Sequence, residues 1–61
     1  MSEHLRYRVE KWSSDGGKLH ETLAMCSTVE FAEAVFTVAI QVFPNELCKI
    51  THGTRLIRRS S

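Results

Sequence analysis

The sequence predicts a small α+β protein, in which one amphipathic helix packs on one face of a small antiparallel sheet. The expected order is β-β-α-β, with a possible further strand at the end. Three observations predict it: residues 4–12 alternate between apolar and polar side chains, residues 28–43 carry apolar side chains at helical spacing, and turn residues separate the segments. One helix on one side leaves the other face of the sheet open, as is usual for this fold class.

The first two strands should form a hairpin. In residues 4–12 the apolar side chains point to one face, where they would meet the helix; they are Leu5, Tyr7 and Val9. Trp12 falls out of phase, and the next six residues, Ser-Ser-Asp-Gly-Gly-Lys, are a dense turn signal. The returning strand, residues 19–26, would point Glu21 inward, which predicts a bulge or a late strand start.

The helix has clear ends. Ser27 and Glu30 have the spacing of a capping box, in which each side chain bonds to the backbone N–H of the other residue. Pro44 disfavours helical geometry for Phe43, so the helix should stop near that residue. The expected helix spans about residues 28–43.

The apolar face of this helix is wider than one sheet requires. On a helical wheel it covers roughly 200°, against the roughly 100° or more needed to pack on a single layer. The sequence therefore predicts an interface on the flanks of the helix, formed by Phe31, Val38, Val42 and Ile40. The alternative is that a curled sheet, together with Leu56 and Ile57, covers the excess.

Two readings compete after the helix. Residues 47–51 should form a third strand, and residues 54–58 are apolar enough for a fourth. His52-Gly53 is either the centre of a tight two-residue hairpin or the site of a bulge in one long strand. We favour the hairpin, followed by a frayed tail at residues 59–61.

Length and composition predict one domain, residues 1–61, of marginal stability. Two cysteines do not make a disulfide-dense scaffold, and no secretory signal is visible. The apolar part of the helix is too short and too interrupted to span a bilayer. We therefore expect a cytoplasmic protein with reduced thiols and no membrane contact, stabilised by oligomerisation.

The two ends of the chain resemble a group of known proteins. Residues 7–12, Tyr-Arg-Val-Glu-Lys-Trp, and residues 50–58, Ile-Thr-His-Gly-Thr-Arg-Leu-Ile-Arg, are similar to those of short uncharacterised bacterial proteins of about 60 residues. In that group an Arg-Val-Glu-x-Trp-like start, a capped helix and a Gly-x-Arg-x-Ile-like end recur. The resemblance implies a bacterial source and the β-β-α-β pattern, and it implies no activity.

Catalytic and metal chemistry find little support. Four residues are of types that bind zinc, but their order and spacing are not those of a usual zinc finger; they are His20, Cys26, Cys48 and His52. Cys48 and His52 lie about 13 Å apart along a strand, too far for a nucleophile and its base. The sequence holds no acid/base pair or glycine-rich phosphate loop, so we expect no enzyme, no cofactor and no bound metal.

The distribution of charge suggests a second kind of partner. Net charge is only +1, but basic residues gather at the two ends of the chain. A nucleic-acid patch could form on the sheet from Arg6, Arg8, Arg55 and Arg58. Glu10 interrupts this patch, and the overall charge is low for such domains. The favoured expectation is a non-enzymatic, self-associating or protein-binding module. Its expected form is a homodimer through a flank of the helix or an edge strand, with nucleic-acid binding as the alternative.

Overall fold

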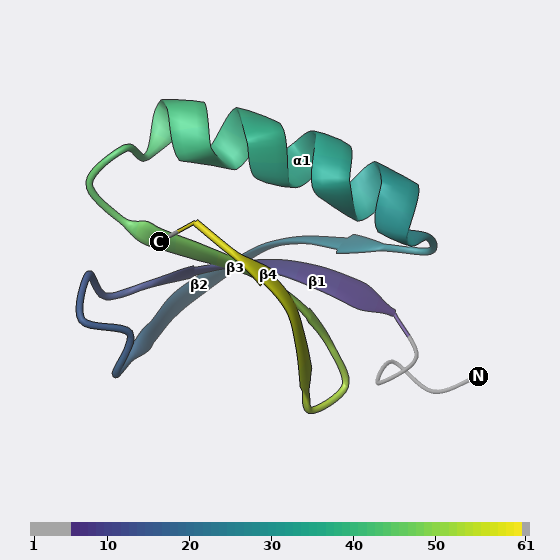
Figure 1. Ribbon diagram of the computed structural model, residues 1–61, viewed down its shortest axis with the longest axis horizontal. Coiled ribbons are helices and arrows are strands. Elements are labelled where there is room, and N and C mark those ends of the chain that lie inside the picture. Colours follow the sequence, from purple (N-terminus) through teal and green to yellow (C-terminus); the bar gives the residue numbers. More distant parts are fainter. Residues whose placement is uncertain (1–5, 61) are drawn as a thin grey trace.

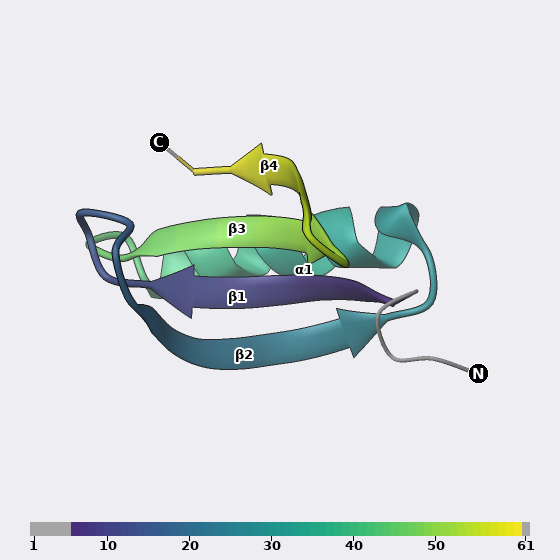
Figure 2. The same ribbon diagram turned by 90° about the horizontal axis from the view of Figure 1, so that it is seen from below.

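The computed structural model describes residues 6–60 and confirms the α+β class. A hairpin of β1 (Tyr7–Trp12) and β2 (Leu19–Cys26) precedes the helix α1 (Val29–Val42), and β3 (Leu47–His52) and β4 (Arg55–Arg59) follow it. Figure 1 shows α1 lying along one face of the sheet. In the described part of the chain no other helix is present, so the opposite face of the sheet has no helix on it. This face, called the open face below, is turned towards the viewer in Figure 2.

The sheet has the strand order β2-β1-β3-β4, and every neighbouring pair is antiparallel. The strand after the helix therefore pairs beside the first strand. The β1–β3 ladder runs without interruption, with Val9 opposite Ile50. Both outer pairs contain irregularities. The two central strands thus form the regular part of the sheet.

The core lies between α1 and the central strands. Its buried side chains are Val9, Cys26, Ala32, Phe36, Ala39, Cys48 and Ile50. Two alanines of the helix allow its backbone to approach the sheet closely, and Phe36 supplies the one large buried ring from α1. Val9 and Tyr7 face this core as predicted, whereas Leu5 lies outside the described residues.

The helix start differs by one residue from the prediction. The N-cap is Thr28, whose hydroxyl accepts a hydrogen bond from the Phe31 N–H at 3.3 Å. The Ser27 capping box is therefore wrong, because a cap at Thr28 puts Phe31, rather than Glu30, at the third helical position. The predicted end is confirmed: Phe43 is the C-cap and donates its N–H to the Ala39 carbonyl.

The end of the chain forms a hairpin, as favoured. The two loop residues are Gly53 and Thr54, one position later than expected, because His52 pairs with Arg55. Gly53 has φ +65° and Thr54 does not have a positive φ. This pattern fits a turn that requires glycine at its first central position.

Bulges occur in both edge strands. In β2 the register shifts twice against β1, which leaves His20 and Leu23 without a partner in the β1 register, so the predicted bulge is confirmed. In β4 the extra residue is Ile57, which packs against the core. Where a frayed tail was expected, Arg59 belongs to β4, and Ser60 accepts from the Cys48 N–H and donates its own N–H to the Cys48 carbonyl.

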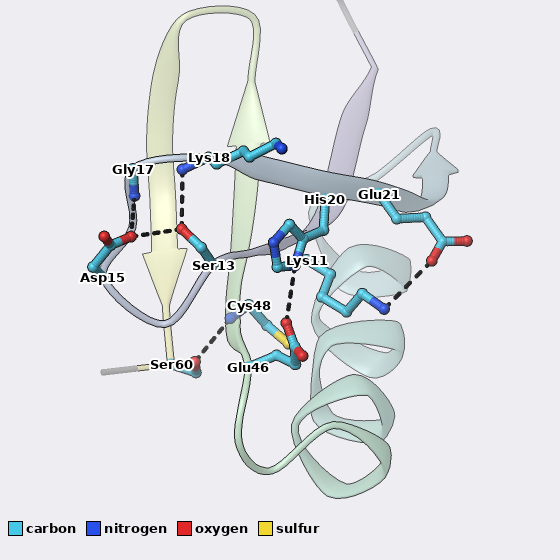
Figure 3. Close-up of polar contacts among 10 residues, drawn as sticks. All are labelled: Lys11, Ser13, Asp15, Gly17, Lys18, His20, Glu21, Glu46, Cys48 and Ser60. Carbon is cyan, nitrogen blue, oxygen red and sulfur yellow. Dashed lines mark hydrogen bonds and ion pairs between the residues drawn. The ribbon is translucent and has the colours of Figure 1, made fainter.

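The loop between β1 and β2 closes over the open face. Ser13 donates its hydroxyl hydrogen to Asp15 at 2.6 Å, and the Gly17 N–H donates to the same carboxylate oxygen at 2.9 Å (Figure 3). Gly16, with φ +78°, approaches Leu47 so closely that a Cβ there would lie 3.2 Å from its methyl carbon. Leu47 is only 1% exposed, although it belongs to the open face.

Gly53→Ala should destabilise the protein by about 1–2 kcal/mol, because an L-residue is strained at positive φ. Gly53→Asn should cost less, since asparagine tolerates this conformation better. Chemical denaturation followed by circular dichroism measures both. Thr54→Ala is the matched control in the same turn. Equal losses for all three variants would contradict the turn geometry.

Asp15→Asn should make stability less dependent on pH. The hydrogen bond from the Ser13 hydroxyl, and then that from the Gly17 N–H, lower the pKa of Asp15. A carboxyl whose pKa is lower in the folded than in the unfolded protein stabilises the fold at pH values above its ordinary pKa of about 3.9. This stabilisation is lost as the pH falls through the pKa of the folded state. The variant should be less stable than the native protein at pH 7 and closer to it at pH 2–3, in paired denaturant titrations. A difference that does not change with pH would refute this role.

Candidate interaction surfaces

One side of the helix presents a row of apolar side chains to solvent. The row, called the helix flank below, consists of Phe31, Val35, Val38 and Val42, spaced by four, three and four residues. Phe31 is 64% exposed, Val38 57% and Val42 60%, and Val35 is half-buried. No charged residue interrupts the row. Sequence reasoning anticipated three of its members, and the fourth, Val35, also packs against the core.

A shallow apolar groove lies between the helix flank and β2. The groove has a volume of about 160 Å³ and is lined by Leu23, Val35, Val38, Ala39, Val42 and Phe43. Leu23, one of the bulged residues of β2, forms the sheet side of this groove. Helix α1 packs on the sheet through Ala32, Phe36 and Ala39, and of the next row of side chains Val35 still packs against the core.

The sheet does not curl over this row. Leu56 and Ile57, the residues expected to cover it, belong to β4, and β4 lies at the opposite edge of the sheet from β2 (Figure 2). Leu56 itself is 47% exposed. The alternative in which the terminal strand covers the wide apolar face is therefore wrong.

Ile40 does not join the helix flank. It is 37% exposed and lines a separate hollow of about 320 Å³ near the start of β3. The other residues around this hollow are Ser14, Phe43, Pro44, Asn45, Glu46, Leu47 and Ser60. The four residues predicted as an interface thus divide into a group of three and one separate residue.

The four predicted arginines do not share a face. Arg8 alternates with Val9 and so belongs to the open face. Arg58 pairs with Ile50 of the core face, and its guanidinium lies 3.1 Å from the carboxylate of Glu33 on α1. Arg55 lies opposite His52, and Arg6 is exposed just before β1. The bulge at Ile57 places Arg58 on the helix side.

The open face gathers a different set of cations. Lys49 and Arg59 lie opposite each other on β3 and β4, in register with Glu10 of β1. The Lys49 ammonium sits 3.9 Å from the centre of the Trp12 ring, whose N–H donates to Glu10 at 3.0 Å. Glu10 is only 5% exposed, so the accessible charge of this row is positive. Sequence reasoning missed Lys49 and Arg59 because their face depends on strand pairing.

The four potential zinc ligands separate into two pairs. Cys26 and His52 both lie opposite Tyr7, at one end of β1, and the His52 and Tyr7 rings stack at 4.1 Å. Cys48 lies at the other end, opposite Lys11, and His20 there contacts Glu46 at 3.1 Å (Figure 3). Among residues 6–60, no group of three or more His, Cys, Asp or Glu side chains is placed to hold a metal ion.

Both thiols are free and buried. Burial raises the pKa of the Cys48 thiol, and the nearby negative charge of Glu46 raises it further. A raised pKa lowers the fraction of reactive thiolate. Because the two cysteines lie opposite β1 residues that are four positions apart, they are too distant for a disulfide within one chain.

Comparisons with protein-family models, with curated proteins and with solved structures each found no match. The resemblance to short bacterial proteins therefore stays a prediction. Within residues 6–60, no helix has the length and apolar character needed to cross a membrane. The geometry of the surfaces is thus the basis for any functional assignment.

Cys48 should react with iodoacetamide at least tenfold more slowly in the folded protein than in the unfolded chain at pH 8, because its side chain is fully buried and its pKa is raised. Mass spectrometry of the alkylated peptides separates Cys48 from Cys26. Labelling in guanidinium chloride is the control and should remove the protection. Rapid labelling of Cys48 under native conditions would show that the start of β3 opens readily.

Proposed function

We propose that this protein is a non-enzymatic interaction module that self-associates as a homodimer through the helix flank. The observation that carries the proposal is the uninterrupted apolar row of Phe31, Val35, Val38 and Val42 beside an apolar groove. Exposed apolar surface of this kind, on a domain so small, is typical of an interaction site. The core of a protein interface is depleted in charged residues, and the helix flank has none.

Association would also supply stability that the monomer lacks. Helix α1 of this short chain has three buried residues, Ala32, Phe36 and Ala39. Covering a phenylalanine or valine that is exposed in the monomer contributes about 1.5–3 kcal/mol for each side chain that becomes fully buried. A specific interface commonly buries about 800 Å² per partner. The total accessible surface here is 4164 Å², so an interface of that size would cover about a fifth of it.

A second candidate, nucleic-acid binding, is favoured by one specific observation. On the open face Lys49 lies over the Trp12 ring, Arg59 lies opposite Lys49 and Arg8 lies further along β1, while Glu10 of the same strand is buried. Single-stranded nucleic acids bind surfaces that combine cations with aromatic rings. The Trp12 ring already holds Lys49 against it, which leaves less of the ring for stacking. Self-association is therefore the first proposal.

The cytoplasm is the compartment that suits this module. Cys26 and Cys48 are free thiols at opposite ends of β1, and reduced cysteines are usual there. No step of the proposed function needs a cofactor, a metal or a membrane. A bacterial source is expected from the resemblance of the two chain ends.

Val38→Glu should abolish the dimer and leave the fold intact. Val38 is 57% exposed, so the monomer keeps the new carboxylate in water, whereas the dimer would bury it without a partner. Sedimentation equilibrium up to high micromolar concentration should show a dimer for the native chain and a monomer for the variant. Circular dichroism checks that the helix is retained.

Gln41→Glu is the matched control, because it adds the same charge to the same helix at an exposed polar position outside the helix flank. It should remain dimeric. A native chain that stays monomeric at high micromolar concentration would refute self-association. If that monomer binds single-stranded DNA with a strong salt dependence, the open face becomes the leading functional surface.

A further inference from the structure

The helix flank carries both a projecting ring and a recess of matching size. Phe31, near the start of α1, is the most exposed large apolar side chain among the described residues, at 64%. The groove between α1 and β2 extends along the same row from Val35 to Val42. The projecting ring of Phe31 therefore lies just beyond one end of the groove.

The size of the groove fits one aromatic ring. Its volume is about 160 Å³, and its lining is almost entirely apolar. An enclosed engineered cavity of about 150 Å³ with an apolar lining binds benzene, so an open groove of this volume has room for one ring. The phenyl ring of Phe31 is thus of the right size and chemistry to occupy this groove in a second copy of the chain.

The spacing of the row makes this arrangement self-consistent. Two antiparallel copies of α1 related by a twofold axis between Val35 and Val38 bring Phe31 of one copy to Val42 of the other. The same axis brings Val35 of one copy to Val38 of the other. Every member of the row then faces another member, as a twofold interface requires. Val42 lines the groove, so the ring meets the recess at both ends of the pair.

We propose that the partner is a second copy of this chain, bound antiparallel through α1, with Phe31 of each copy inserted into the groove between α1 and β2 of the other. This inference rests on the proposed self-association and specifies its geometry. The two grooves are filled at once, so the dimer closes and exposes no further copy of the same site. The four residues that meet across the twofold axis are all apolar.

Disulfide trapping tests the geometry. One sample of the full chain carries Phe31→Cys and a second, isotope-labelled sample carries Val42→Cys, and the two are mixed under mild oxidation. When the proposed dimer contains one chain of each sample, its two new cysteines face each other. When both chains carry Phe31→Cys, the two new cysteines lie roughly 16 Å apart along the helix axis. In this mixed dimer the Val42→Cys chain keeps its Phe31, which still enters the unchanged groove of the Phe31→Cys chain.

The cross-linked product should be at least tenfold richer in mixed pairs than in like pairs, as measured by mass spectrometry. The native chain, whose two thiols are buried, is the control and should give no cross-link. Preferential pairing of Phe31→Cys with itself would overturn the antiparallel arrangement. A dimer by sedimentation that gives no mixed cross-link would overturn this geometry but keep self-association, and a monomeric native chain would overturn both.

A second variant tests the ring without a cross-link. Phe31→Leu should raise the dissociation constant of the dimer several-fold, and Phe31→Ala should raise it by more than tenfold, because each dimer loses two inserted rings. Neither change should shift the unfolding midpoint of a dilute monomer by much, since Phe31 is largely exposed there. Ile40→Ala, on the other side of α1, is the control. An unchanged dissociation constant for Phe31→Ala would overturn the proposal.

Discussion

The close packing of α1 on β1 and β3 is the constraint on which the rest of the structure depends. One 14-residue helix has to cover a four-stranded sheet, and it approaches through the two small residues Ala32 and Ala39. That approach buries Val9 and Ile50 completely. It also fixes the rotation of α1, so in the next row of side chains Val35 still packs against the core, whereas Phe31, Val38 and Val42 are exposed. The exposed helix flank is a direct result of how the core closes.

The open face is stabilised in a different way. No helix among the described residues covers it, yet Leu47 is buried there, because Gly16 brings the β1–β2 loop against it. Next to this contact, Glu10 accepts from the Trp12 N–H, while Lys49 lies over the Trp12 ring. Buried polar groups are tolerated where they are paired, and none of the described side chains leaves a buried polar atom without a partner. A small local cluster thus replaces a second layer.

Local signals were enough to predict the elements, and errors arose where neighbouring residues share the same chemistry. Ser27 and Thr28 both carry a capping hydroxyl, and the sequence could not decide between them. Gly53 lies in both versions of the turn, so only the pairing of His52 with Arg55 places it. The faces of Arg58 and Arg59 depend on the bulge at Ile57, which reverses the alternation in β4. The groove beside Leu23 depends on how α1 is rotated, and a sequence pattern does not contain this information.

The bulges in β2 and β4 have a consequence for how this chain meets its neighbours during and after folding. An edge strand with a regular ladder offers its free backbone groups to any other extended chain, which leads to open-ended aggregation. Here the regular ladder runs only between the inner strands, and both outer strands are broken by extra residues. Neither border of the sheet is therefore a good template for adding another strand. Growth by strand addition is therefore discouraged at both borders of the sheet.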